Sequence, residues 1–319
     1  MSPRPHGEAP LLYRNAVLIY NPVAGRLRKS SDALVGRVLG ILRAQGHSVR
    51  SLPTTGPRTA SGLARVAIDC GADLIVGLGG DGTLNEIAEG ITPSKTPLAA
   101  LPGGTANVLL NELGLGNSVE DATRLVADLV PERISTGLVT TREGSRQFLL
   151  MLGAGLDAQI VYQLNPRLKS RFGKLAYWLA GSQQTYRRLK QFTIRLNGHS
   201  ETCSFALASR VSNYGGDLEI ARRTSLLDGE FEVVLFRGRL AFCYVKYLVG
   251  VLTHSHYGMR GISVETAQRL ELNPLEGARI HMQVDGEYLG CMPATIELVP
   301  DSLTLLIPEA YRRKAATRR

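Results

Sequence analysis

Residues Asp73-Leu-Ile-Val-Gly-Leu-Gly-Gly-Asp-Gly-Thr-Leu-Asn-Glu86 join an apolar run to a glycine-rich loop. The run has the composition of a buried strand, the loop is Gly79–Thr83, and helix-like residues follow it. Glycine lets the backbone approach an anion closely, and the amides that open a helix point toward such an anion. The order of these segments predicts a phosphate-binding loop at the carboxyl end of a strand.

On both sides of this loop, strand-like and helix-like segments alternate. Strands are expected at 16–20, 48–52, 74–78 and 98–101, and helices at 31–45, at 59–70 and from the loop to residue 88. Such alternation is typical of a parallel sheet covered by helices. We therefore predict an α/β nucleotide-binding domain over residues 15–137.

The second half of the chain has a different sequence pattern. Short β-like runs separated by turn residues occur at 148–152, 192–196, 204–209, 231–236, 280–284, 295–299 and 303–307. This pattern predicts a C-terminal antiparallel β-sandwich-like domain over 138–308, interrupted by helices at 171–189 and 240–254, the latter expected in the core. Residues 1–14 and 309–319 are expected to be tails, with the basic end from Arg312 disordered.

Composition limits the partners and the compartment. The 319 residues suit two domains, and the net charge of +9 favours anionic partners. The four cysteines are far apart and form no CxxC pair, which argues against a zinc site or a disulfide framework. The N-terminus lacks the apolar core of a signal peptide, and the longest apolar run, 240–252, is too short to span a bilayer. We expect a cytoplasmic protein whose membrane contact is peripheral.

Three glycine-containing turns follow predicted strands, at Asn21–Gly25, Gly79–Thr83 and Pro102–Thr105. Ligands of open α/β sheets bind beyond the carboxyl ends of the strands, so three such turns at one edge favour a ligand site. A P-loop motif is absent. Gly77–Gly82 matches GxGxxG, but the acidic residue that a dinucleotide fold needs about 20 residues later is missing.

The same residues resemble a known family. Gly79-Gly-Asp-Gly-Thr-Leu-Asn-Glu86 is similar to the signature of the diacylglycerol kinase catalytic domain, which sphingosine, ceramide and bacterial lipid kinases share. Asn21–Gly25, Thr54–Ala60 and Pro102–Asn107 resemble that family's first, second and fourth loops, and the resemblance runs from about Val17 to Pro308. NAD kinases also contain GGDGT, but Asn85-Glu86 and the opening Asn21-Pro22 point to the lipid-kinase branch.

The resemblance implies an ATP site and a Mg²⁺ ion. The residues it assigns to the nucleotide are Asn21, Gly25, Thr54, Gly79, Gly80, Asp81, Gly82, Thr83, Asn85, Glu86, Gly104 and Thr105. Backbone amides and the hydroxyls of Thr83 and Thr105 suit phosphate oxygens. The Asp81 carboxylate would carry Mg²⁺, since without a metal it would repel the triphosphate. A helix N-cap is the alternative role for Asp81.

Two Asp-Gly-Glu turns, Asp228–Glu230 and Asp285–Glu287, lie between β-like runs. Either could be a simple hairpin turn, because Asp-Gly is a preferred hairpin dipeptide. By resemblance, Glu287 is the general base that takes the proton of the lipid hydroxyl, with Asp285 as a second choice. By the same resemblance, Ser225, Asp228 and Glu230 form a structural Mg²⁺ site. The chain departs from the family at Val108, where aspartate is common, and at Arg222 and Thr224.

The positive charge also bears on membrane and nucleic-acid contacts. Residues 158–200 contain basic and aromatic side chains and no acidic one. A basic amphipathic helix at 171–189 would bind an anionic membrane surface, or it packs as an ordinary helix of the fold. No nucleic-acid-binding motif accompanies the charge. A homodimer is compatible with the sequence, which does not fix the oligomeric state.

We therefore predict an ATP-dependent lipid kinase, most closely of the diacylglycerol kinase type. The alternatives are an NAD kinase relative that phosphorylates a ribose hydroxyl, and a nucleotide- or lipid-binding regulator without turnover. The sequence does not identify the lipid.

Overall fold

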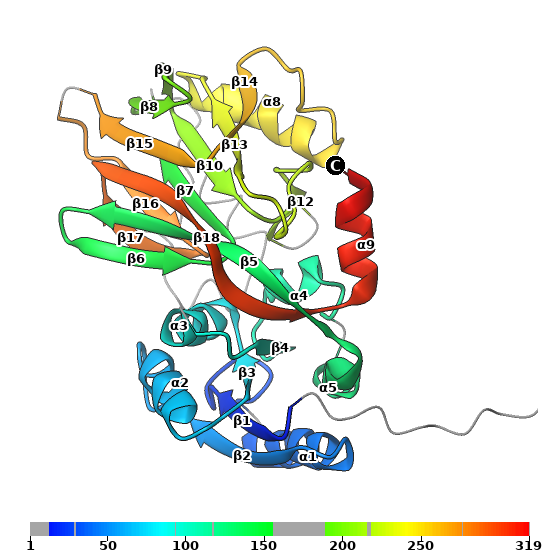
Figure 1. The fold of residues 1–319 in the computed structure, drawn as a ribbon. Coiled ribbons are helices and arrows are strands. Elements are labelled where there is room, and N and C mark those ends of the chain that lie inside the picture. Colours follow the sequence, from blue (N-terminus) through cyan, green and yellow to red (C-terminus); the bar gives the residue numbers. More distant parts are fainter. Residues whose placement is uncertain are drawn as a thin grey trace, which may run out of the picture. The chain divides into compact units, whose positions relative to one another are not determined.

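The computed structural model describes residues 13–318 except 29, 93, 117, 156–188, 216–217 and 276 (Figure 1). The described residues form two compact units. The first contains the chain up to Glu132 together with Leu303–Tyr311, and the second contains Arg133–Ser302 together with the residues from Arg312 onward.

The first unit is built on a parallel sheet. Its strands β1 (Asn15–Tyr20), β2 (Ser48–Pro53), β3 (Leu74–Gly79) and β4 (Leu98–Pro102) are ordered β2-β1-β3-β4. Every residue of β3 and β4 is buried, as expected for strands covered on both faces. The parallel sheet predicted from the sequence is confirmed.

Helices α1 (Ser31–Ala44), α2 (Ala60–Asp69), α3 (Asp81–Ile91), α4 (Val108–Glu112) and α5 (Val119–Leu125) cover this sheet, and the short turn Val126–Asp128 follows. In α3, buried Leu84, Ile87, Ala88 and Ile91 recur at helical spacing, which gives the helix one apolar face. Ser118 caps α5 by accepting a hydrogen bond from the Asp121 amide. Helix α2 packs against α3, and α1 packs against α5 (Figure 1).

The second unit contains an antiparallel six-stranded sheet ordered β14-β13-β10-β7-β16-β17. These strands are β7 (Met151–Gly155), β10 (Phe205–Ser209), β13 (Phe231–Phe236), β14 (Ile262–Ala267), β16 (His281–Val284) and β17 (Glu287–Cys291). Strands β8 (Phe192–Leu196), β9 (His199–Cys203), β15 (Arg269–Pro274) and the first half of β18 (Ala294–Ile307) form another layer, and β5 (Val130–Thr141) pairs with β18 and with β6 (Gly144–Phe148). A small pair, β11 (Asn213–Gly215) and β12 (Leu218–Glu219), and helices α8 (Ala241–Leu252) and α9 (Glu309–Arg318) complete the described elements.

Alternating side chains from the two layers meet in the core of this unit. In β8, Phe192, Ile194 and Leu196 are buried and the residues between them are not. They belong to the same cluster as Phe231 and Val233 of the other sheet. This alternation confirms the predicted antiparallel β-sandwich-like domain.

Several sequence-based boundaries were wrong. The run predicted as one strand at 148–152 is split between β6 and β7, and the runs at 295–299 and 303–307 are one strand, β18. Residues 303–308 return to the first unit, since Leu305 pairs in parallel with Leu98. The basic tail is helical in α9, and Tyr311 and Ala315 are buried.

Helix α8 was expected in the core but buries only part of its surface. Tyr247 and Val251 are buried, whereas Val249 and Leu252 are more than half exposed. The helix predicted at 171–189 lies, up to residue 188, outside the described residues. None of the helices in the described ranges combines the length and apolarity that a membrane crossing requires.

Candidate active site

The three predicted loops converge at the carboxyl edge of the parallel sheet. The Asn21 amide donates to the Leu78 carbonyl at 3.0 Å, and the Arg26 amide donates to the Gly103 carbonyl at 3.0 Å. The Asn21 side-chain amide also donates to the Thr83 hydroxyl at 3.3 Å. The first loop is thus bound to both of the others.

Glycine is required where the second and third loops touch. The Gly103 amide donates to the Gly79 carbonyl at 2.8 Å. A Cβ atom on Gly104 would lie 2.5 Å from the Gly80 Cα, and one on Gly103 would lie 2.8 Å from the Gly79 Cα. These separations are too short for any side chain, so glycine allows the two backbones to approach each other at the sheet edge.

The buried Asn107 fixes the third loop. Its side chain accepts from the Gly104 amide at 2.8 Å and donates to the Gly104 carbonyl at 3.0 Å. Asn107 itself is left-handed, with φ 46° and ψ 50°, a conformation that asparagine tolerates. Val108, at the family's usual aspartate position, is buried at the start of α4.

Asp81 opens α3 but does not cap that helix. Its Oδ1 accepts from the Leu109 amide at 3.1 Å, in the first turn of α4. The carboxylate is half-buried. Asp81 therefore connects the second loop to the helix after the third, and its role in holding Mg²⁺ stays a prediction.

The remaining predicted nucleotide residues fall into two groups. Thr54 lies beside the first loop, since its amide donates to the Tyr20 carbonyl at 2.8 Å. Gly25 lies next to Thr105, because a Cβ on Gly25 would be 3.0 Å from the Thr105 hydroxyl. Glu86 instead holds the start of α2, because its carboxylate accepts from the Arg58 amide at 2.8 Å and the Ala60 amide at 3.1 Å. Asn85 is buried on α3. The nucleotide contacts of these residues stay predictions.

The predicted base lies in the second unit, on the hairpin of β16 and β17. Asp285 and Gly286 form its turn with φ values of 48° and 80°, and Val284 pairs with Glu287. Two left-handed residues define the turn that Asp-Gly prefers in hairpins. Glu287 is therefore the first residue after a tight turn.

Asp285 anchors this hairpin to the rest of its sheet. Its carboxylate accepts from the amides of Leu149, Leu150 and Met151 at 2.9, 3.0 and 2.9 Å. This capture splits the strand expected at 148–152. It also gives Asp285 a structural role and leaves Glu287 as the better candidate for a base.

The Glu287 carboxylate forms an ion pair with the Arg146 guanidinium of β6. About half of the Glu287 side chain and a quarter of the Arg146 side chain are exposed. The sequence did not indicate Arg146, because it lies 141 residues away from Glu287. The pair orients a carboxylate that solvent can still reach.

Two of the predicted structural metal residues, Ser225 and Asp228, form one tight turn, and Glu230 follows it in sequence. The Ser225 amide donates to Asp228 Oδ2 at 2.7 Å, and the Asp228 amide donates to the Ser225 carbonyl at 3.0 Å. A cavity of about 420 Å³ lies beside this turn. The residues that line it include Asp228, Glu230, Glu232 and Glu265. This oxygen-rich donor set fits a hard divalent cation.

Buried Glu232 supports that turn and was missed by sequence reasoning. It accepts from the amides of Arg223 and Thr224 at 2.8 Å each, and from the Tyr257 hydroxyl. Burial, followed by the hydrogen bond to Glu232 and its negative charge, raises the pKa of Tyr257. Thr224, one of the positions at which the chain departs from the family, therefore contributes its backbone amide to the hydrogen bonds that Glu232 accepts.

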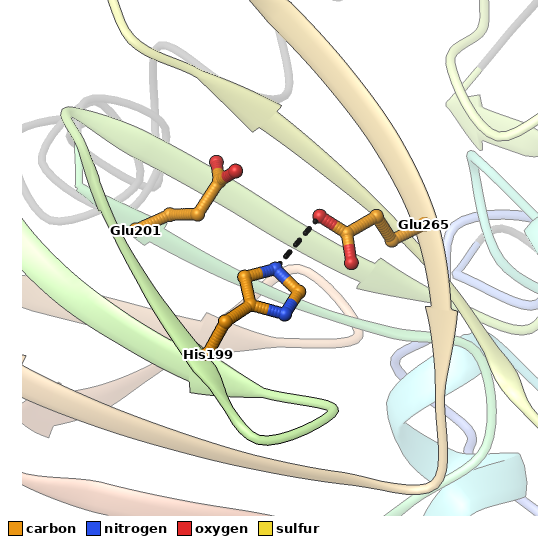
Figure 2. A group of neighbouring side chains, drawn as sticks. All are labelled: His199, Glu201 and Glu265. Carbon is orange, nitrogen blue, oxygen red and sulfur yellow. Dashed lines mark hydrogen bonds and ion pairs between the residues drawn. The ribbon is translucent and has the colours of Figure 1, made fainter.

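Figure 2 shows a second group that the sequence did not suggest, made of His199, Glu201 and Glu265. Their ligand atoms lie within 4.8 Å of one another, and His199 Nε2 is 3.3 Å from Glu265 Oε1. The Arg237 guanidinium and the Ser263 hydroxyl both donate to Glu201. Because Arg237 already balances the Glu201 charge, ion pairing accounts for this group.

Comparison with known proteins agrees with this architecture. A family model described as the diacylglycerol kinase catalytic domain matches residues 15–139, and one described as the YegS C-terminal NAD kinase beta sandwich-like domain matches residues 151–307. The chain is 27% identical over 286 residues to a diacylglycerol kinase of Bacillus subtilis, covering 88% of this chain and 92% of that protein. It is 27% identical over 293 residues to a diacylglycerol kinase of Staphylococcus aureus strain Newman, covering 88% of both.

Solved structures share the fold. A diacylglycerol kinase structure from Bacillus anthracis has a TM-score of 0.75 at 20% identity, covering 94% of this chain and 99% of that one. Another structure from the same organism has a TM-score of 0.80 at 20% identity, covering 95% and 98%. The two domain matches, the converging loops and these relatives together show that the chain belongs to the diacylglycerol kinase catalytic-domain family of lipid kinases.

Proposed function

We propose that this enzyme transfers the γ-phosphoryl group of ATP to a lipid hydroxyl, and that its acceptor is a diacylglycerol-type lipid. The single observation that carries the proposal is the convergence of the three loops, with glycine required where the backbones of Gly79–Gly80 and Gly103–Gly104 meet. The names of the relatives support the choice of acceptor.

In this proposal the triphosphate lies against the amides of the glycine loop. Thr83 and Thr105 donate their hydroxyls to its oxygens, and Asn21 orients Thr83 through the 3.3 Å hydrogen bond. Asp81 would hold a Mg²⁺ ion, which would neutralise charge on the β- and γ-phosphates. Ser225, Asp228 and Glu230 would hold a second ion that braces the fold and takes no part in the reaction.

Glu287 is the proposed general base. As the lipid oxygen forms its bond to the γ-phosphorus, its proton passes to the Glu287 carboxylate and the bond to the ADP oxygen breaks. Arg146 orients the carboxylate, and Asp285 holds the hairpin that presents it. Positioning and electrostatic stabilisation supply most of the catalysis expected for phosphoryl transfer.

The test is transfer of radiolabelled γ-phosphate from ATP to a panel of dispersed lipids and to NAD. We expect labelled phosphatidic acid from diacylglycerol and no labelled NADP. Glu287→Gln should abolish transfer and leave ATP affinity, measured by calorimetry, nearly unchanged. Labelled NADP without labelled lipid, or wild-type turnover in the variant, would overturn the proposal.

We also propose peripheral association with anionic membrane surfaces in the cytoplasm. Two observations support this: the net charge of +9, and the location of a lipid acceptor in a bilayer. The basic run at 158–188 adds no structural support, because it lies outside the described residues. Co-sedimentation with phosphatidylglycerol vesicles should exceed that with phosphatidylcholine vesicles and fall with salt. Equal, salt-insensitive binding to both would contradict it.

A further inference from the structure

Four side chains gather along one side of the β16–β17 hairpin. Arg279 precedes β16, His281 begins it, and Tyr288 and Cys291 lie on β17. We call these four residues the Cys291 cluster. All of them belong to the second unit.

A β-bulge brings Tyr288 to the same side as Cys291. His281 pairs directly with Cys291, but the register shifts between Met282, opposite Gly290, and Gln283, opposite Tyr288. In a regular strand, residues three apart point to opposite faces. The extra residue, together with φ 130° at Gly290, turns Tyr288 toward His281.

Three polar groups surround the Cys291 sulfur. Arg279 Nε donates to Sγ at 3.4 Å, and His281 Nδ1 and the Tyr288 hydroxyl lie 3.5 and 3.7 Å from it. The Tyr288 hydroxyl is also 3.1 Å from His281 Nδ1. A thiol proton can therefore pass to the imidazole directly or through Tyr288, and the guanidinium is placed to stabilise the resulting thiolate.

The protonation states of the neighbours suit this chemistry. Burial, then the charges of Arg279 and Lys190, lower the pKa of His281, so its imidazole is neutral near pH 7. Burial, then the hydrogen bond to Cys291 and its charge, raise the pKa of Tyr288 to about 12, so its hydroxyl stays a donor.

The other cysteines offer a comparison within the same molecule. Cys70, at the end of α2, is exposed. Cys203 is buried, and burial raises the pKa of its thiol, which keeps it protonated. Cys291 is less exposed than Cys70 but sits among the groups that activate a thiol. If the neighbouring groups determine thiol reactivity, Cys291 should react faster than Cys70. If exposure determines it, Cys70 should react faster.

We propose that Cys291 is a modification site at which hydroperoxides oxidise the thiolate to a sulfenic acid. The sulfur attacks one peroxide oxygen, an S–O bond forms and the O–O bond breaks. The leaving oxygen takes the proton that His281 received, so hydrogen peroxide is reduced to water as the sulfur loses two electrons. Donors from Arg279 and Tyr288 stabilise the leaving oxygen.

The experiment uses the full chain exposed to hydrogen peroxide in the presence of dimedone, with each cysteine quantified by mass spectrometry over time. We expect Cys291 to be labelled roughly tenfold faster than Cys70. Arg279→Gln and His281→Asn should each slow Cys291 to the rate of Cys70 or below. Arg269→Gln is the matched control, since it removes an exposed arginine elsewhere in the sandwich and should leave the ratio unchanged.

Labelling of Cys291 at or below the rate of Cys70 would overturn the proposal, as would wild-type labelling in both cluster variants. Circular dichroism melting of each variant separates loss of reactivity from loss of fold. Iodoacetamide labelling provides a second readout that needs the thiolate but no peroxide. A faster Cys291 in both reactions supports the activated thiol.

Discussion

Asp285 and Met151 bind each other through two hydrogen bonds: the Asp285 amide donates to the Met151 carbonyl at 3.0 Å, and the Met151 amide donates to Asp285 Oδ1 at 2.9 Å. The same carboxylate holds the amides of Leu149 and Leu150. The hairpin that presents Glu287 is therefore fixed through its turn residue, 134 residues from its partner in sequence.

Replacing Asp285 by asparagine should destabilise the second unit. The amide keeps the left-handed backbone but loses the charge and one acceptor, which should lower the free energy of unfolding by about 1–3 kcal/mol. Urea denaturation measures the loss. Asp301→Asn is the matched control, because Asp301 is also left-handed, with φ 44°, and is exposed in β18. Equal stability of the two variants would contradict the anchoring role.

Arg146 should act as a positioning residue for Glu287. In Arg146→Gln the carboxylate loses its ion-pair partner, and we expect kcat to fall roughly tenfold to a hundredfold, the cost of small misplacement. Arg146→Lys should recover part of the loss, because lysine keeps the charge without the planar geometry. Steady-state kinetics with ATP and lipid varied separately should show unchanged KM for ATP. A change confined to KM for ATP would place Arg146 outside this role.

The contrast between the two units shows how much the sequence could predict. Strands β1, β3 and β4 and their loops are local signals, because each is an apolar run followed by glycine or proline. Edge strands such as β9 and β17 are short, partly polar and mostly exposed or half-buried, so they form through pairing with a neighbouring strand and not through a pattern of their own. Because the strands were predicted to be parallel, the three loops that follow them were expected at the same edge of the sheet.

Long-range polar contacts could not be predicted from the sequence. The break after Phe148 exists because Asp285 captures the next three amides, and the role of Glu86 is set by Arg58 and Ala60 at the start of another helix. Likewise, two strands were predicted at 295–299 and 303–307, but β18 is continuous through Pro300 and Asp301, with Asp301 in the left-handed region. Pairing partners, and not local propensity, fix these features.

The glycine contact between the second and third loops should be indispensable. In Gly104→Ala the new Cβ would lie 2.5 Å from the Gly80 Cα, so the loops must separate. We expect destabilisation of about 1–3 kcal/mol, as for overpacking, and loss of measurable ATP binding by calorimetry. Gly40→Ala is the control, because a Cβ at this position of α1 would meet nothing within 4 Å. Gly40→Ala should be neutral or should stabilise the protein by up to about 1 kcal/mol. ATP binding retained in Gly104→Ala would refute the close-approach argument.

Removal of divalent metal should destabilise the protein through the turn of Ser225–Asp228. Two explanations compete: the turn is held by its own hydrogen bonds and by Glu232, or its oxygens also bind Mg²⁺. A bound ion at a concentration a hundredfold above its Kd adds about 2.7 kcal/mol, which EDTA would remove as a fall in Tm. Asp228→Asn should abolish the EDTA effect, whereas Asp69→Asn, at an exposed position ending α2, should preserve it. If EDTA lowers the Tm of Asp228→Asn as much as that of the wild type, the ion binds elsewhere; if it lowers neither, the internal hydrogen bonds suffice.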